Sequence, residues 1–469
     1  MLMDFFILLK QELVIVAIIF LLLFIKLGKD RTNESLLPLI NVVLLLNLLL
    51  GFFGSKEGSL FGEMFHTGKL IILEKNILNL ATWIISLLSF SWLRTHKHVI
   101  EFYILLLTAL LGMFFMISSG NLLVLYLGLE MSTIPIAAAA NFDLAKRKSS
   151  EAAMKMIISS AFSSALVLLG ISWIYGVSGS LDFSVILLQG PDSPFRIFAF
   201  ILLVSGFAFK MSAVPFHLWT ADVYEGAPVS VTAYLSVVSK DSVVFVILAF
   251  LYNAGKAFAD TWYHILIVLS ILSIIIGNLF ALRQNNFKRF LAFSSIAQVG
   301  FIFIGIAGSS QVSSAAVVYF VLVYVFSNLA AFGVVALVSA ISGKENISDY
   351  KAFYTTNPLL SWVLTIAMFS LAGVPPTAGF FGKFFLLMAG AAKGNYWLIG
   401  IAALNMVVSF YYYLRVVKAI FMEENPQHIE KLAIPGASRL ALYICLAGML
   451  IAGLASCVYD YIYSISFGL

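Results

Sequence analysis

Charged residues are scarce in this chain of 469 residues, because Asp, Glu, Lys and Arg together make up only 11% of it. Soluble domains are about 25% charged, whereas 61% of this chain is hydrophobic. The composition therefore excludes an ordinary soluble domain. The formal net charge is +5, but the basic residues are spread over short segments and form no basic domain. Nucleic-acid binding is therefore not expected.

Cysteine is nearly absent. The two cysteines, Cys445 and Cys457, both lie in the last apolar stretch. This excludes a disulfide framework and leaves no pattern for a zinc, iron–sulfur or haem site, so we expect both to be buried packing residues. The sequence also lacks a nucleotide-binding loop and a flavin motif. We expect no metal, no cofactor and no electron-transfer chemistry in this chain.

Long apolar runs dominate instead. A bilayer core of roughly 30 Å needs about 20 apolar residues in a helix, and bare strands would leave backbone groups unpaired in lipid. We predict an all-α polytopic membrane protein with fourteen transmembrane helices, the first of which is expected to be retained. The predicted spans are 7–26, 36–53, 71–93, 102–118, 121–141, 152–176, 196–219, 229–252, 262–281, 289–306, 314–341, 360–390, 396–414 and 440–462.

The basic residues predict an orientation. Loops on one side of the membrane hold 18 Lys and Arg residues, and loops on the other side hold 7. The excess marks the cytoplasmic side. An even number of spans then places both termini on the non-cytoplasmic side, which we expect to be the outer face of a bacterial inner membrane. The 7 residues assigned to that face are Lys10, Lys56, Lys69, Lys75, Arg196, Lys256 and Lys393.

Four ionisable residues mark the interior of predicted spans: Glu130, Lys210, Lys240 and Lys383. At about 1.5 Å per residue, Glu130 lies ~14 Å into its span, Lys210 ~21 Å and Lys240 ~17 Å. A charge at a helix centre costs at least about 2.5–3.5 kcal/mol, and such groups usually face a hydrated interior and mark an ion path. Burial disfavours a charged amine, and a nearby carboxylate favours it. We therefore predict a proton path in which Glu130 controls Lys210.

A structural interpretation stays open for these residues, because buried polar groups also join helices as ion pairs or hydrogen bonds. Asp241 follows Lys240 and points about 100° away around the helix, so it is either a partner or a bystander. His217, Gln298 and Tyr324 are further candidates for a proton relay or a file of water. Their alternative roles are loop anchoring and helix joining.

Prolines interrupt two spans beside the buried lysines. Pro215 follows Lys210 in the seventh span, and Pro375 and Pro376 precede Lys383 in the twelfth. Discontinuous helices in corresponding positions of two halves indicate an ion site in transporters built from inverted repeats. The alternative is that these are ordinary prolines of membrane helices.

Five spans separate the two breaks, so we predict two inverted five-helix repeats, made of spans 4–8 and 9–13. The chain then divides into an N-terminal three-helix segment (1–101), a first repeat (102–252), a second, inverted repeat (262–420) and a C-terminal helix (440–469).

Five stretches carry a family resemblance. They are FKMSAVPFHLWTADVYEGAPVSVTAYLSVVSK (209–240), LYLGLEMSTIP (125–135), NLFALRQNNFKRFLAFSSIAQVGF (278–301), LAGVPPTAGFFGKF (371–384) and SFYYYLRVV (409–417). Together they resemble the antiporter-like subunits of proton-pumping NADH:quinone oxidoreductase, respiratory complex I. The Asp-Val-Tyr-x-Gly form in the first stretch resembles the N type of these subunits.

The resemblance implies roles for single residues. Glu130 corresponds to the buried glutamate of the fifth span in this family. The lysines of the seventh, eighth and twelfth spans correspond to Lys210, Lys240 and Lys383. The tenth span of the family usually carries a histidine where this chain has Gln298. Glutamine does not titrate, so a relay through that position must use water or another route.

The resemblance also implies a function. The chain is expected to be a non-redox, proton-translocating subunit of NADH:quinone oxidoreductase, with no catalytic residues of its own. It would move protons in response to quinone reduction elsewhere. NADH, FMN, iron–sulfur clusters and quinone are expected in partner subunits, and neighbouring membrane subunits are the expected partners. Two alternatives stay open: a subunit of a multi-subunit cation/proton antiporter or membrane-bound hydrogenase, and a static scaffold.

Overall fold

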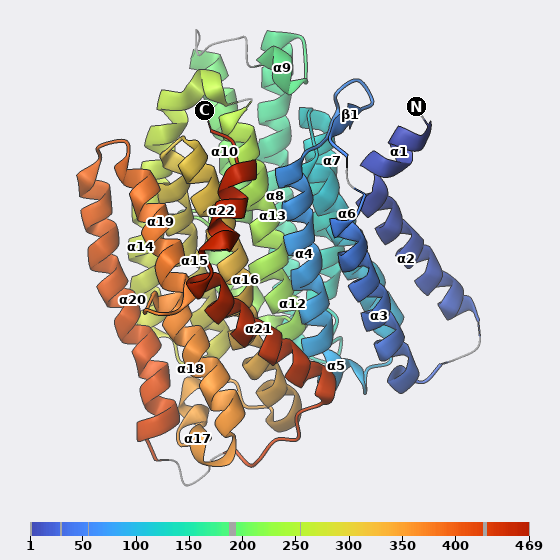
Figure 1. Cartoon of the computed structure of the whole chain (residues 1–469), viewed down its shortest axis with the longest axis vertical. Helices are drawn as coiled ribbons and strands as arrows, with labels where there is room; N and C mark the ends of the chain where they lie inside the picture. Colours follow the sequence, from blue (N-terminus) through green and yellow to red (C-terminus); the bar gives the residue numbers. More distant parts are fainter. Residues whose placement is uncertain are drawn as a thin grey trace.

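The structure, a computed structural model, is a bundle of long helices that run mostly side by side (Figure 1). It describes residues 2–28, 31–54, 56–186, 194–253, 255–424 and 429–468. Lys29, which counts toward the cytoplasmic basic residues, lies outside the described residues. Within the described part, 11 helices are long and apolar enough to cross a membrane. The prediction of a helical, polytopic membrane protein is therefore confirmed.

The bounds of these helices agree with the predicted spans. They are α3 (Asn33–Phe52), α4 (Lys69–Leu88), α6 (Val99–Ile117), α7 (Leu122–Ala140), α8 (Arg147–Ser178), the continuous α12 and α13 (Val229–Tyr252), α14 (Ala259–Arg283), α15 (Phe287–Ala307), α16 (Gln311–Ser342), α20 (Tyr396–Met422) and α21 (Gly436–Leu454).

Three predicted spans coincide with helices outside this set. The first is α2 (Lys10–Leu27), which carries three charged residues in its 18 positions. The seventh is split into α10 (Pro194–Lys210) and α11 (Leu218–Gly226), and the twelfth into α18 (Pro358–Ala372) and α19 (Ala378–Ala391). The count of fourteen spans and the inverted repeats stay predictions.

Short elements connect the long helices. A β-hairpin of β1 and β2 pairs Gly58 with Thr67 in antiparallel register, within a segment for which the sequence suggests only a loop. The short elements are α1 (Leu2–Leu8), β1 (Gly58–Leu60), β2 (Phe65–Thr67), α5 (Phe90–Leu93), α9 (Phe183–Ile186), η2 (Lys256–Phe258), η3 (Ile347–Tyr350), α17 (Phe353–Thr356) and α22 (Ser456–Ile465).

Both predicted helix breaks are confirmed. The chain leaves α10 at Lys210 and passes Pro215 before α11 begins. It leaves α18 through Gly373, whose φ is +86°, and passes Pro375 and Pro376 before α19. Proline lacks the backbone donor that a helix needs and clashes with the preceding turn. Each break frees the last carbonyls of the helix before it.

A π-helical turn, η1 (Leu235–Ser239), lies between α12 (Val229–Tyr234) and α13 (Lys240–Tyr252). The sequence did not predict it. Single π turns inside α-helices occur frequently at functional sites. This one ends directly before Lys240.

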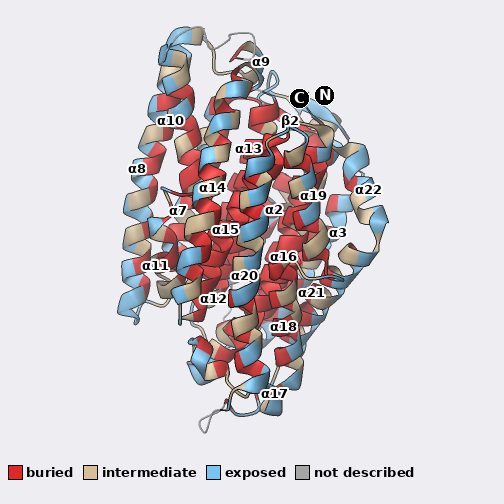
Figure 2. Cartoon of the chain, turned by 90° about the vertical axis from the view of Figure 1, so that its left-hand side faces the viewer, coloured by how far each residue is buried: buried red, intermediate tan, exposed pale blue. Residues whose placement is uncertain are grey.

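The core lies around α15. Every residue in the apolar window of α15 is buried, compared with 28% of the window of α20. Figure 2 shows the buried residues gathered in the middle of the bundle and the exposed ones on outer helices such as α8. Exposed leucines and phenylalanines on those outer helices are expected to face lipid. Polar side chains on α15 therefore lie far from lipid.

Two sequence-based assignments are wrong. Lys75 does not lie in a loop, because it stands inside α4 and is 1% exposed. Its amine pairs with the carboxylate of Glu12 at 2.5 Å, which explains how the helix carries a charge into apolar surroundings. The two cysteines also differ: Cys445 is buried, as expected for packing, but Cys457 is exposed.

Helices α6 and α7 approach closely at two glycines. A Cβ on Gly112 would lie 2.5 Å from the backbone nitrogen of Ser132, and one on Gly128 would lie 2.7 Å from that of Met116. Small residues permit such close contacts between membrane helices. This contact fixes α7, the helix that carries Glu130, against the bundle.

We expect Gly112→Ala to destabilise the protein, because overpacking typically costs about 1–3 kcal/mol. Gly176→Ala is a matched control, since nothing lies within 4 Å of its added Cβ and alanine is favoured over glycine in helices by roughly 0.5–1 kcal/mol. The measurement is the fraction of each variant that stays soluble after detergent-solubilised membranes are heated. Equal or greater heat resistance of Gly112→Ala would contradict the close packing.

Candidate functional site

The four predicted ionisable residues all lie in described helices, but their burial differs. Lys240 is 3% exposed and Lys383 is 1% exposed, whereas Glu130 and Lys210 are partly buried. Lys210 ends α10 at the first break, and Lys383 stands in α19 just after the second. The structure therefore places two of the three lysines at helix interruptions.

Lys210 and Glu130 are neighbours across α10 and α7. The amine of Lys210 donates a hydrogen bond to the hydroxyl of Thr133, one helical turn after Glu130. The Lys210 amine lies within electrostatic range of the Glu130 carboxylate, although no ion pair within 4.0 Å joins them in the described part of the chain. Oε1 of Glu130 is buried and has no hydrogen-bond partner among the described residues. This oxygen can therefore accept a further hydrogen bond.

Lys240 is held from α15 and α11. Its amine donates to Oγ of Ser295 at 2.7 Å and lies 5.3 Å from the ring centroid of Tyr224, a distance at which an aromatic ring attracts a cation. The adjacent Asp241 is 1% exposed, and its Oδ2 has no hydrogen-bond partner in the described part. A buried amine and a buried carboxylate thus stand side by side after the π-helical turn.

Lys383 occupies the end of the broken α18. Its amine donates to the carbonyl oxygens of Leu371 at 2.7 Å and Ala372 at 3.3 Å. These carbonyls are free because α18 stops there, and the C-terminal end of a helix attracts cations. The ring of Phe301, whose centroid is 5.0 Å from the amine, adds a further favourable contact. The helix break therefore makes the binding place for the lysine.

Gln298 joins the surroundings of Lys383 to α20. Its side-chain nitrogen donates to the carbonyl oxygen of Leu371 at 3.0 Å, so Gln298 and Lys383 share one acceptor. The same nitrogen donates to the hydroxyl of Tyr413 at 3.2 Å. Tyr413 in turn forms a hydrogen bond with Ser294. The predicted relay residue is therefore part of a network, but as a fixed donor between two acceptors.

The polar face of α15 connects the two buried lysines. Ser294 and Gln298 are four residues apart and lie on one face of the helix. Ser295, which binds Lys240, is the direct neighbour of Ser294. Polar groups therefore succeed one another across the centre of the bundle, from Lys240 through the two serines, Tyr413 and Gln298 to the carbonyl that binds Lys383.

A side branch leads to Tyr324 on α16. Its hydroxyl lies 3.3 Å from Oγ of Ser236, which also accepts from the side chain of Asn328 at 2.7 Å. Ser236 stands one turn before Lys240, so Tyr324 is near this lysine. His217 lies in the first break and is 8% exposed. Its Nδ1 has no partner among the described residues, and no hydrogen bond within that part of the chain joins its side chain to the network.

Ion pairs fasten α11 at the basic end of the bundle. Arg289 of α15 binds Asp222 at 2.7 Å and Glu225 at 3.0 Å, and Lys155 binds Asp222 at 2.6 Å. Partial burial alone would raise the pKa of Asp222, but hydrogen bonds from Lys155 and Arg289 outweigh it and lower the pKa below its usual value. These pairs hold the helix that presents Tyr224 to Lys240.

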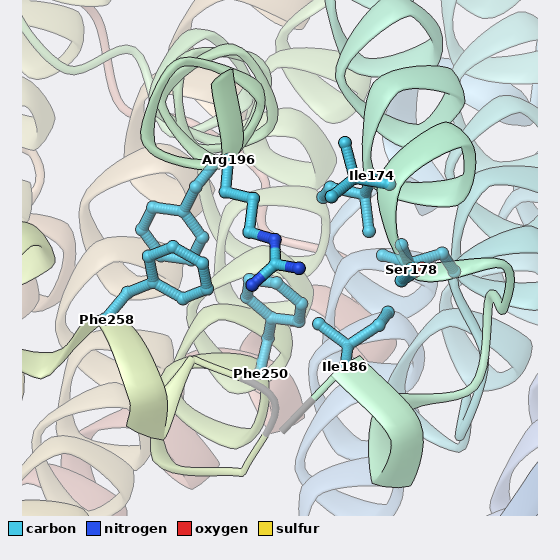
Figure 3. A pocket seen from close by; sticks show the side chains of 9 residues that line it. Ile174, Ser178, Ile186, Arg196, Phe250 and Phe258 are labelled. Carbon is cyan, nitrogen blue, oxygen red and sulfur yellow. The ribbon is translucent and has the colours of Figure 1, made fainter. Parts of the chain in front are cut away.

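Two hollows flank this network. A polar cavity of about 370 Å³ lies at the same basic end, lined among others by Lys148, Ser230, Lys288 and Glu345. It reaches the first turn of α12, the helix that leads to Lys240. A separate pocket receives the side chain of Arg196 between aliphatic and aromatic side chains of α8, α10 and α13 (Figure 3). It includes none of the four predicted ionisable residues.

Sequence analysis missed several members of the network. Ser294 and Ser295 could have been found from the sequence, because with Gln298 they place three polar residues within five positions of an otherwise apolar span. Tyr413 and Tyr224 stand in stretches that carry the family resemblance, but nothing in their spacing distinguishes them from the neighbouring tyrosines as members of the network. The carbonyl of Leu371 is detectable only from the helix break. None of these groups is ionised at neutral pH.

Comparison with known proteins agrees with this architecture. Residues 119–409 match the family described as NADH:quinone oxidoreductase/Mrp antiporter, TM. The chain is 42% identical over 476 residues to NADH-quinone oxidoreductase subunit N of Azobacteroides pseudotrichonymphae, with 99% of both chains covered. It is also 42% identical over 454 residues to subunit N of Phocaeicola vulgatus, with 96% of both covered.

Solved structures share the fold. A chain of the respiratory complex I from Thermus thermophilus with bound aureothin superposes with a TM-score of 0.83 at 27% identity, over 96% of this chain and 98% of that one. A chain of the membrane-bound sulfane sulfur reductase, an archaeal respiratory membrane complex, superposes with a TM-score of 0.85 at 22% identity, over 98% and 96%. The second likeness concerns the fold alone. By sequence over nearly its whole length, this chain belongs to the family of NADH:quinone oxidoreductase and Mrp antiporter transmembrane subunits.

Proposed function

We propose that this chain is the N-type antiporter-like subunit of a bacterial NADH:quinone oxidoreductase and that it translocates protons. The observation that carries the proposal is the succession of polar groups between Lys240 and Lys383, in which hydrogen bonds join every step except the one between the adjacent residues Ser295 and Ser294. These polar groups lie on and around α15, whose apolar window is completely buried. Polar groups are costly in such surroundings, and those that occur there are usually functional. A network with a lysine at each end is suited to accept a proton at one end and release one at the other.

The proposed route begins at the polar cavity on the basic, cytoplasmic end. A proton passes from there to Lys240 and along the hydroxyls of Ser295, Ser294 and Tyr413 toward Lys383. Gln298 orients the network but does not carry the proton, because an amide does not titrate, so the step from Tyr413 to Lys383 uses water. Lys383 releases the proton toward the opposite side.

The pair of Glu130 and Lys210 is the proposed switch. When the Lys210 amine approaches Glu130, opposite charge favours its protonated form; when it turns to Thr133, that support is weaker. Two further groups extend the route near Lys240, namely Asp241 and, through Ser236, Tyr324. His217 stays a predicted relay residue, and no hydrogen bond among the described residues connects its side chain to the route.

The same proposal includes fourteen spans and two inverted five-helix repeats. Three observations support it. Each predicted span coincides with a helix or a split pair of helices, the two breaks stand five spans apart, and both chain ends lie at the end of the bundle opposite α17 (Figure 1). The last observation agrees with an even number of spans, which with the distribution of basic residues places both termini outside the cytoplasm.

Redox chemistry belongs to partner subunits in this proposal. NADH, FMN, iron–sulfur clusters and quinone are bound there, and this chain is a non-redox part of the translocating enzyme. Its partners are neighbouring membrane subunits, which the exposed apolar helices contact together with lipid. The deciding experiment is deletion of the gene. Loss of NADH-driven quinone reduction in membranes supports the proposal, whereas loss of sodium tolerance alone would favour a cation/proton antiporter.

We expect Lys240→Ala to abolish proton pumping, because it removes the ionisable group at the start of the route. The measurement is NADH-driven acidification of inverted membrane vesicles, normalised to the amount of assembled complex. Lys256→Ala, which changes an exposed lysine just after α13, is the control and should pump normally. Normal pumping by an assembled Lys240→Ala complex would favour a static scaffold.

Tyr413→Phe tests the middle of the route. The change removes the hydroxyl between Ser294 and Gln298 and leaves the buried Ser294 hydroxyl without this partner, at a cost of about 1–3 kcal/mol. A barrier raised by that amount slows a step roughly 5- to 150-fold, and we expect proton pumping to fall accordingly. Tyr411→Phe is the matched control, since Tyr411 stands on the same helix and is 67% exposed. Equal pumping by both variants would exclude Tyr413 from the route.

A further inference from the structure

A second group of buried charges lies outside the proposed route, between α2 and α4. The amine of Lys75 pairs with Oε1 of Glu12 at 2.5 Å, and the two side chains are 1% and 3% exposed. Glu74, the preceding residue, is 2% exposed and lies within electrostatic range of Lys75. Three ionisable side chains are therefore buried together in a part of the molecule for which the family resemblance implies no site residue.

The charges of these three side chains do not cancel. Two carboxylates and one amine leave a net negative charge when all are ionised, and an uncompensated charge in apolar surroundings is strongly disfavoured. Oε2 of Glu12 is buried without a hydrogen-bond partner in the described part of the chain. One more positive charge, placed on a carboxylate, would neutralise the group.

The hairpin and the aromatic rings enclose this group. The amine of Lys75 lies 5.0 Å from the ring centroid of Phe65 in β2 and 5.7 Å from that of Phe114 in α6. Beside it, Gln11 donates to Asn76 at 2.7 Å. A Cβ on Gly51 would fall 1.9 Å from Oδ1 of Asn76, so α3 closes against this layer. The hairpin separates the group from the end of the bundle where both termini lie.

A row of polar residues leads from this group into the bundle along one face of α4. Asn79, Thr82 and Ser86 follow Lys75 at helical spacings of four, seven and eleven residues. Asn79 accepts from Asn47 at 2.8 Å, and Ser86 shares a hydrogen bond of 2.7 Å with Tyr103.

The row reaches the span that carries Lys240. Helix α12 packs against α4, and the hydroxyl of its Tyr234 donates to the carbonyl of Leu106 at 2.9 Å. Tyr234 stands directly before the π-helical turn that ends at Lys240. The polar face of α4 therefore extends from the hairpin end to the helix of the central lysine.

The neighbouring charges do not supply the missing positive charge. Lys56 pairs with Asp4 at 3.1 Å and Lys69 lies 3.7 Å from Glu57, all with exposed side chains. Lys10 donates to the carbonyl of Phe53. On α2, α3 and α6, Lys26 pairs with Glu101 and Glu34 with Arg94. Other titratable groups on the described elements around the site include the partly buried His66 of β2, Arg439 of α21, the exposed Asp460 of α22, the tyrosines of α6, α12 and α16, and Lys240 with Asp241 on α13.

We propose that Glu12, Glu74 and Lys75 form a second protonatable site, which holds one exchangeable proton at the hairpin end and communicates with Lys240 along α4. The inference rests on the proposed proton translocation, to which it adds a place where protons are held on the non-cytoplasmic side. In the resting site the proton resides on one of the two carboxylates, and the other remains paired with Lys75.

Glu74→Gln is the deciding variant. It leaves the pair of Glu12 and Lys75 intact and neutral, so the fold keeps its ion pair while the exchangeable proton is lost. Glu12→Gln is the second variant, in which Glu74 remains to neutralise Lys75. Glu57→Gln, at an exposed carboxylate near the start of α4, is the matched control. Each is introduced into the full complex and assayed in inverted membrane vesicles and after purification.

Two readouts are measured. The infrared spectrum of the purified complex reports protonated carboxyl groups, and both site variants should lack one such signal that the control retains. Vesicle acidification per NADH oxidised, at equal amounts of assembled complex, should fall at least twofold in both site variants and stay unchanged in the control. If Glu12→Gln fails to assemble, Glu74→Gln alone decides.

A wild-type spectrum and wild-type pumping in Glu74→Gln would overturn the inference and leave the Glu12–Lys75 pair as a structural contact. A carboxyl signal that disappears when sodium is added to the wild-type complex would also overturn it, because the site would then hold a metal cation. Lys240→Ala in the same vesicles separates the two proposals. If that variant pumps, proton translocation by this chain fails; if it is inactive while Glu74→Gln is normal, only the second site fails.

Discussion

The cost of placing charge in hydrocarbon governs this structure. Each buried lysine meets that cost in a different way: Lys383 with the open carbonyls of α18, Lys240 with Ser295 and an aromatic face, and Lys75 with a carboxylate. A buried charge that loses its partner is strongly destabilising. The helix breaks, the aromatic rings and the complete burial of α15 are therefore linked consequences of carrying amines through the bundle.

The arrangement of α15 follows from the same constraint. Its surface is covered by α11, α14, α16 and α19, so its serines and Gln298 are shielded from lipid on every side. A network of hydroxyl and amide groups in such surroundings is rigid when its members are satisfied, and sensitive when one is removed. Function and packing are thus located on the same helix, and they cannot be varied separately.

Much of this could be predicted from the sequence. Apolar runs and prolines predicted the helices and both breaks, because hydrophobic length and the missing proline donor act locally. The deep position of Lys240 also followed from counting, whereas the prolines in its span left the depth of Lys383 open. The groups that contact these lysines did not follow from the sequence. Tyr413 and Tyr224 come from distant segments, and the residue type of Leu371 does not show that its backbone carbonyl is free to accept a hydrogen bond. Lys75 was misassigned because it stands near a span end, where only tertiary structure distinguishes a buried amine from an exposed one.

The π-helical turn η1 changes the directions in which the side chains of the eighth span point around the helix axis. A regular α-helix advances about 100° per residue, and a π turn contains an extra residue relative to that pattern. A helical wheel drawn through Val229–Tyr252 with a constant period therefore rotates everything after Ser239 by roughly one position. On such a wheel Lys240 is drawn in the direction that Asp241 actually takes, and the direction toward Ser295 is assigned to Ser239. Whether the amine or the preceding serine meets α15 is decided by a local irregularity of the backbone.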